Sequence, residues 1–315
     1  MTEQKFTARE LEEGLGTFFT RGFSHIRVED SSLTENKQAL LAFLRSIAKK
    51  EGQVLFEFFL SVEMLEKDIV NALAETASTL VISFNGGEQK NFAKKIALLN
   101  DLGLSFGFIV ELNEKNTETK KLFSRLLEEI AGYFPNHVYF SFEKSFASKL
   151  TEKDAELLRA ISHCFELFYT EGRAVPWFKS LLLSLKISAY AFISDFYEWF
   201  LLNNYTLPTE TEEKYPFAKI LKMQERFIQF KLEEKKISYI YPVIEDILRL
   251  HAAFSEAIVE GKETELVLHY SPEDTLSPSS FYFLRFYDEV CAEKTAIRVF
   301  LTEEGPEYEI LPFFT

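Results

Sequence analysis

The strongest constraint on the fold is the regular alternation of short apolar runs with amphipathic stretches between residues 25 and 143. A helical stretch also precedes the first run, with Thr7 as its expected N-cap and Glu10 as its capping-box partner. Parallel strands need a long crossover between them, usually a helix. The alternation therefore predicts a parallel sheet, either doubly wound or part of a (β/α) barrel. The five expected strands are the runs HIRVED, VLFEFFL, TLVISFN, LSFGFIVEL and HVYFSFE.

The pattern changes after residue 148, which predicts a second domain. From there to about residue 262 the chain is predicted to form helices separated by Pro, Gly and Asn residues. The tail, about 263–315, is predicted to be β-rich and closes in a hairpin that turns at Gly305, although 280–290 fits a helix or a strand. We therefore expect a partial barrel over 1–148, then a helical domain with a β-rich tail over 149–315.

Charge and cysteine content exclude several functions. The net charge is −14 and no basic cluster interrupts it, so a nucleic-acid partner is not expected. The first residues lack the apolar core of a signal peptide, and no apolar run reaches the ~20 residues of a membrane span, so we expect no membrane partner and a cytoplasmic location. Cys164 and Cys291 are too far apart for a clustered thiolate metal site made by this chain alone, and both are expected to be buried and inert.

The loop Asn85-Gly86-Gly87-Glu88 follows an expected buried strand, where folds of this class place their ligands. Glycine permits positive φ and a close approach of the backbone. The loop lacks the GxGxxG and GxxxxGK[ST] spacings, so phosphate binding is not supported. It is either a ligand-cradling loop or a plain turn, and we favour the turn.

Carboxylates near the ends of the expected strands form a second candidate site: Asp30, Glu57, Glu111 and Glu143, with Glu29 close by. Converging carboxylates can bind a hard divalent cation or transfer protons, and the alternative is a solvated rim. His25 and His137 open strands at the opposite end, so we expect them to be structural.

Two features of the helical region also have alternative interpretations. His163 and Cys164 have apolar neighbours and are expected in the core. The segment 169–178, with an Arg and a Trp, either covers the barrel mouth or forms a packed corner.

The block from Arg27 to Glu88 resembles the barrel of B12-binding-type radical SAM proteins. It has a strand ending at Asp30, a helix opening near Asn36, an aromatic strand LFEFF, the helix start MLEKD and the glycine loop after ISF. HCFELFYTEGRA and FISDFYEWF are similar to helices of the domain often attached to that barrel. The resemblance implies a TIM-like barrel of radical SAM type with the loop at 85–88 beside the S-adenosylmethionine pocket.

The departures from that family concern its chemistry. The CxxxCxxC loop that holds a [4Fe–4S] cluster is missing, as are the first barrel strand and the cobalamin domain, and Phe59 and Ser83 stand where relatives often carry acids. We therefore predict an incomplete barrel without a cofactor, acting as a binding or protein-interaction module rather than an enzyme. A protein partner or a small ligand is expected at the barrel mouth, in a pocket where the 85–88 loop lies beside Asp30 and Glu57. The tail hairpin is expected to cover the open edge of the barrel.

The alternative to this interpretation is catalytic. The chain is then an enzyme that uses the rim carboxylates with a divalent metal, or a half-barrel that a partner chain completes.

Overall fold

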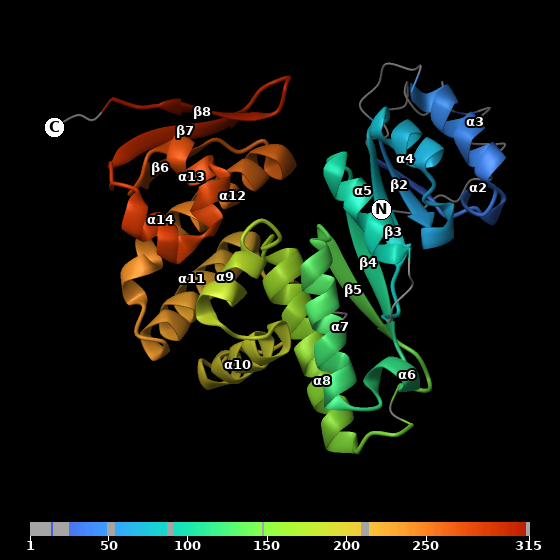
Figure 1. Ribbon diagram of the computed structural model, residues 1–315, viewed down its shortest axis with the longest axis horizontal. Coiled ribbons are helices and arrows are strands. Elements are labelled where there is room, and N and C mark those ends of the chain that lie inside the picture. Colours follow the sequence, from blue (N-terminus) through green and yellow to red (C-terminus); the bar gives the residue numbers. More distant parts are fainter. Residues whose placement is uncertain are drawn as a thin grey trace. The chain divides into compact units, whose positions relative to one another are not determined.

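The computed structural model describes Gly14 and residues 25–48, 54–86, 91–146, 148–208 and 214–312. The chain divides into two compact units, Met1–Glu152 and Lys153–Thr315 (Figure 1). The expected capping box of Thr7 and Glu10 lies outside the described residues.

The first unit is built on a parallel sheet with the strand order β1-β2-β3-β4-β5. A doubly wound sheet reverses its strand order once, so this consecutive order excludes that alternative and is the order in which a (β/α) barrel is wound. The parallel α/β sheet is thus confirmed, but the described strands form an open sheet and not a closed barrel. All five expected strands are present: β1 (His25–Val28), β2 (Leu55–Leu60), β3 (Ser78–Ser83), β4 (Ser105–Leu112) and β5 (His137–Phe142).

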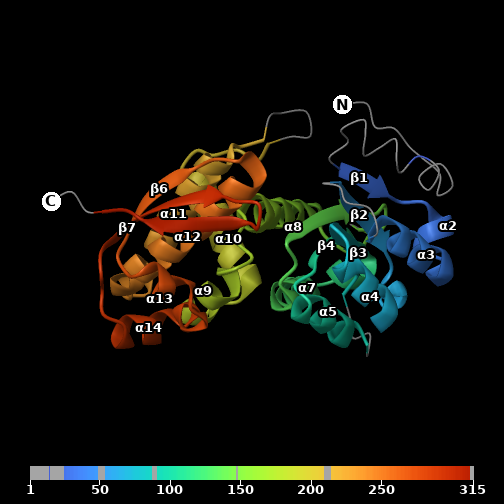
Figure 2. The ribbon, with the colours of Figure 1, turned by 90° about the horizontal axis from the view of Figure 1, so that it is seen from above.

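The helices of the first unit lie on one face of this sheet (Figure 2). Right-handed crossovers that always advance in one direction place every connecting helix on the same side. In β1 the residues that face the helices are buried and their neighbours are exposed, whereas β3 and β4 each contain three consecutive buried residues. The helices on this side are α2 (Ser31–Thr34), α3 (Lys37–Ala48), α4 (Lys67–Ala74), α5 (Phe92–Asp101) and α7 (Lys120–Tyr133), and the short elements η1 (Val62–Met64) and α6 (Glu114–Thr117) follow the ends of β2 and β4.

Side-chain caps fix where several of these helices begin. The carboxylate of Asp30 accepts a hydrogen bond from the backbone N–H of Ser32 (2.9 Å) at the start of α2. Asn36 accepts from the first turn of α3, as the sequence predicted for a helix that opens near this residue. Such caps satisfy N–H groups that have no partner within the helix.

The second unit begins with helices that surround an aromatic core. Phe168 is its centre, with ring centroids 4.9 Å from Phe196, 5.2 Å from Phe192 and 5.9 Å from Trp177. The predicted helical region is confirmed, and among the described helices none has both the length and the low charge that crossing a membrane requires. Its helices are α8 (Glu152–Phe165), the π-helix η2 (Glu166–Glu171), α9 (Phe178–Leu185), α10 (Ala189–Leu202), α11 (Phe217–Glu234), η3 (Ser238–Ile240), α12 (Tyr241–Glu260), α13 (Pro272–Leu276), η4 (Pro278–Phe281) and α14 (Phe283–Glu289).

The tail forms a separate three-stranded antiparallel sheet of β6 (Thr264–Leu268), β7 (Thr295–Leu301) and β8 (Pro306–Ile310). The predicted hairpin is β7–β8, but β7 pairs with β6 on its other side and the hairpin does not extend the parallel sheet. The hairpin therefore does not cover that sheet's edge by pairing with it as a further strand. The reason is packing, because Ile297 and Val299 of β7 are buried with Leu250 and Ala253 of α12. The ambiguous stretch 280–290 is mostly helix, as α14.

Candidate functional site

The candidate site is the face of the parallel sheet opposite α2–α7, called here the helix-free face because none of these described helices lies on it. All-parallel sheets usually have both faces covered, so a second face with exposed side chains is where a ligand or partner can reach this unit. Tyr139 is 45% exposed there, and Arg27, Ser83 and Ser141 are also exposed. By strand alternation this face carries His25, Arg27, Leu55, Glu57, Phe59, Thr79, Val81, Ser83, Ser105, Gly107, Ile109, Glu111, His137, Tyr139 and Ser141.

Arg27 is held in a fixed position on this face. Its guanidinium carbon lies 4.3 Å from the centroid of the Phe59 ring. Its Nε lies 3.0 Å from a carboxylate oxygen of Glu29 and 3.3 Å from one of Glu57. Stacking and two ion pairs leave the guanidinium less freedom than a surface arginine usually has. Phe59, which stands where the resembled family often carries an acid, provides the ring on which the Arg27 guanidinium stacks.

His137 lies over a glycine of the neighbouring strand. The register pairs it with Gly107, and a Cβ at Gly107 would lie 2.1 Å from the Nε2 atom of the imidazole. Burial lowers the pKa of His137, and the carboxylate of Glu57 opposes this effect in part. The imidazole is therefore neutral at neutral pH, beside the ring of Tyr139 at 5.5 Å between centroids. No sequence signal marks this contact, because it depends on the register of β4 against β5.

The described half of the glycine loop has the contacts of a turn. Gly86 has φ +75°, and a Cβ there would lie 2.9 Å from the Cδ1 atom of Leu126 in α7. The side-chain amide of Asn116 donates to the backbone carbonyls of Asn85 (3.2 Å) and Glu111 (2.8 Å). Packing and hydrogen bonding therefore account for Asn85 and Gly86 without a ligand, whereas Gly87 and Glu88 lie outside the described residues.

The register of the strands places the 85–88 loop away from Glu57, one of the residues expected beside it. Glu57 pairs with Thr79, and Asn85 lies six residues further along the chain, roughly 20 Å at the usual rise of a strand. The pairing of Ser83 with Ile109 instead brings Asn85 opposite Glu111. The expectation that the loop lies beside Glu57 is therefore wrong, because Glu57 lies three residues before the end of β2, whereas Asn85 lies beyond the end of β3.

The four candidate metal ligands do not gather in one place. Asp30 caps α2, Glu57 pairs with Arg27, and Glu143 accepts a hydrogen bond from the Ser145 hydroxyl (3.3 Å). Glu111 lies on the rim with Asn85. Across the residues that the structure describes, no three His, Cys, Asp or Glu side chains are placed to hold one metal ion.

The two thiols do not fit the iron–sulfur cluster of the resembled family. Both belong to the second unit, whereas the cluster would be expected on the sheet. Cys164 is buried in α8, and this burial raises the pKa of its thiol. Cys291 is exposed, so the expectation of two buried thiols is wrong for it. It lies two residues beyond the end of α14, at the surface.

His163 and the segment 169–178 lie in the helical region, and only the segment is packed as a core element. The side chain of His163 is half exposed and its Nδ1 lies 3.4 Å from a carboxylate oxygen of Glu166, so its expected place in the core is wrong. The segment 169–178 is a packed corner. Trp177 is buried, and Arg173 stacks on Phe217 at 3.9 Å from the ring centroid to the guanidinium carbon.

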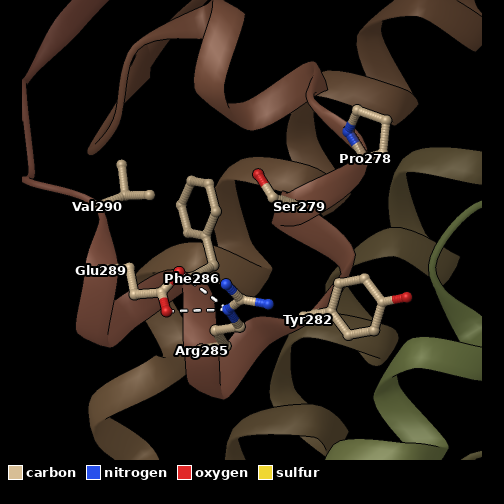
Figure 3. Close-up of a pocket in the computed structure, with 7 residues that line it drawn as sticks. All are labelled: Pro278, Ser279, Tyr282, Arg285, Phe286, Glu289 and Val290. Carbon is tan, nitrogen blue, oxygen red and sulfur yellow. Dashed lines mark hydrogen bonds and ion pairs between the residues drawn. The ribbon is translucent and has the colours of Figure 1, made fainter.

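A surface pocket of about 310 Å³ lies in the second unit, between η4 and α14 (Figure 3). Sequence reasoning placed its pocket beside the glycine loop and missed this one. A Pro/Ser-rich turn followed by a stretch of ambiguous structure carries no recognisable signal for a binding site.

Comparison with known proteins found no family model, no curated protein and no solved structure that matches the chain. The function of this protein must therefore be inferred from the contacts within its two units.

Proposed function

We propose that this chain is a non-catalytic relative of radical SAM enzymes and works as a binding module through the helix-free face of its sheet. The observation that carries the proposal is a parallel sheet in consecutive order with all its described helices on one side. A barrel wound in this way uses the opposite face as its interior. Here that face presents accessible polar and aromatic side chains.

The charge of this face favours a positively charged partner segment. Arg27 is its only basic side chain apart from the histidines among the described strand residues, against Glu57 and Glu111 within the strands and Glu29 and Glu143 just beyond them. The whole chain carries a net charge of −14. Complementary charge accelerates encounter with a partner and disfavours partners of like charge. Phe59 and Tyr139 add the aromatic contact area that interfaces use.

The number and spacing of the cysteines support the loss of radical SAM chemistry. A [4Fe–4S] cluster of this type needs three closely spaced thiolates, and this chain has two cysteines separated by more than a hundred residues. The enzyme alternatives stay predictions: rim carboxylates with a divalent metal, or a half-barrel completed by a partner chain.

Anaerobic reconstitution with iron and sulfide tests this proposal. We expect no iron bound beyond that of a control in which Cys164 and Cys291 are both replaced by Ser. We also expect no cleavage of S-adenosylmethionine under reducing conditions and no micromolar binding of it by calorimetry. A stoichiometric [4Fe–4S] cluster that cleaves S-adenosylmethionine would refute the proposal. Micromolar binding lost in the Gly86→Val variant would instead show that the 85–88 loop is a working cofactor loop.

A further inference from the structure

The pocket between η4 and α14 has an apolar floor fixed by aromatic packing. Phe286 is 2% exposed, and its ring packs edge-on against Tyr270 with centroids 5.1 Å apart. Pro278 and Val290 line the pocket, and Tyr282 contributes a ring that is 67% exposed. This lining offers flat apolar surface that solvent can reach.

A charged pair supplies the polar side of the pocket. The Nε of Arg285 donates to both carboxylate oxygens of Glu289, at 2.9 Å each. Both bonds leave from Nε, so the donors of the two Nη groups remain for another acceptor. Figure 3 shows the guanidinium between the carboxylate of Glu289 and the ring of Tyr282. As an exposed pair, these side chains contribute little to folding.

We propose that this pocket binds a small aromatic molecule that carries a single carboxylate. A planar ring can stack against the exposed ring of Tyr282 above the apolar floor, and a carboxylate matches the fork of guanidinium donors that the Nη groups offer. The volume of about 310 Å³ is at the lower end of ligand pockets, which suits a small molecule.

Glu289 limits the charge of this ligand. Its carboxylate already offsets the charge of Arg285, so the second charge of a phosphate would have no counter-charge and would be repelled by Glu289. A cation would instead be repelled by the positively charged guanidinium of Arg285. A monoanion is the charge that this pair accommodates best. The site belongs to the second unit and is independent of the binding face proposed for the sheet.

Three probes with the same ring test the proposal: indole-3-acetate, indole-3-acetamide and tryptamine, titrated against the full chain by ligand-observed NMR. We expect saturable millimolar binding of the acetate, weaker binding of the neutral amide and the weakest binding of the amine, because a ligand of this size gains limited free energy. The Arg285→Gln substitution should lower the affinity for the acetate by about tenfold and the affinity for the amide by less than threefold. Tyr282→Ala should lower the affinity for the acetate and for the amide.

The matched control is Arg125→Gln in the first unit, which breaks an equivalent pair: Arg125 Nε lies 2.9 Å from a carboxylate oxygen of Glu129, also four residues on. It should leave all three affinities unchanged. Because Arg285 and Tyr282 are exposed, both variants should keep the wild-type unfolding temperature, which shows that they fold. The proposal is overturned if the acetate shows no saturable binding, if the amine binds as tightly as the acetate, or if Arg285→Gln weakens the acetate no more than Arg125→Gln does.

Discussion

The two units bury their aromatic residues in different ways. In the first unit Phe56, Phe58, Phe106 and Phe108 form rows along two strands, packed between the sheet and its helices. In the second unit the rings gather around Phe168 from several helices. The sheet therefore builds its core on the helix side mainly from alternate strand residues, and of the residues on the other face Arg27, Ser83, Tyr139 and Ser141 stay exposed. The helical core has no such alternation, and its pocket lies at the surface between short helices.

The aromatic centre of the second unit gives the largest expected effect. Phe168→Ala should lower the free energy of unfolding by about 3–5 kcal/mol, because it leaves a cavity and removes several ring contacts. Tryptophan fluorescence during denaturation is a direct measurement, since Trp177 and Trp199 both belong to this unit. A loss below about 2 kcal/mol would mean that the cluster closes around the missing ring, and the contrast between the two cores would weaken.

Acid should destabilise the second unit through His251. Burial lowers the pKa of this histidine from 6.5 to about 4. The unfolded chain therefore binds more protons between these values, and the free energy of unfolding falls as the pH falls through that window. The expected loss from pH 7 to pH 4 is about 3 kcal/mol.

Comparing the pH dependence of unfolding in the wild type and in His251→Leu isolates this contribution. The variant should have a smaller slope between pH 6.5 and pH 4, by up to the one proton that His251 takes up on unfolding. An unchanged slope would show that His251 is protonated in the folded protein. His137 in the first unit contributes in the same direction, since its pKa is also lowered.

A buried side-chain amide in the second unit bridges two backbone carbonyls, as the amide of Asn116 does in the first unit. In the π-helix η2, Gly172 N–H bonds to the carbonyl of Leu167 and Ala174 N–H to that of Tyr169, each five residues back. Arg173 N–H departs from this pattern and bonds to Thr170, which leaves the carbonyl of Phe168 without a helical partner. The Nε2 atom of the buried Gln224 donates to that carbonyl (2.8 Å) and to the carbonyl of Gly172 (3.0 Å).

Gln224→Leu should therefore cost about 2–3 kcal/mol, because two buried carbonyls lose their donor. The measurement is denaturation followed by far-UV circular dichroism, which reports on the helices of both units. Gln38→Leu, at an exposed position of the first unit, is the control and should change the stability by less than about 0.5 kcal/mol. Equal effects at the two positions would mean that the π-helix does not depend on this amide.

The local sequence pattern was sufficient to predict the strands and most of the helices. Runs such as LFEFFL in β2 are apolar on the buried side of a covered sheet, and Asn36 marks the start of α3 by its side-chain chemistry. The consecutive strand order was expected only as one of two alternatives, because crossover length does not fix the direction in which strands are added.

Contacts between distant segments could not be predicted from the sequence. The separation of Asn85 from Glu57 follows from the register of β2 and β3, which places Glu57 within the sheet and Asn85 beyond its edge, and the place of His137 over Gly107 follows from the register of β4 and β5. The hairpin joined β6 because its apolar side packs on α12. Cys291 looked like an ordinary buried thiol, and its exposure depends on the end of a short helix.

The most direct test of the proposed binding face compares neighbouring residues that point to opposite faces of the sheet. Ile82 and Phe140 are buried on the helix side, whereas Ser83 and Ser141 are exposed on the helix-free face. The measurement is the free energy of unfolding of the four single Arg variants at these positions. Ile82→Arg and Phe140→Arg should lose about 4 kcal/mol or more, or fail to fold, because a charge is buried without a partner.

Ser83→Arg and Ser141→Arg should change the stability by less than about 0.5 kcal/mol, because the helix-free face is accessible in the free protein. This result would support a face available for binding. Losses at the two serine positions as large as those at Ile82 and Phe140 would contradict the proposal, because the face would then be part of a closed core.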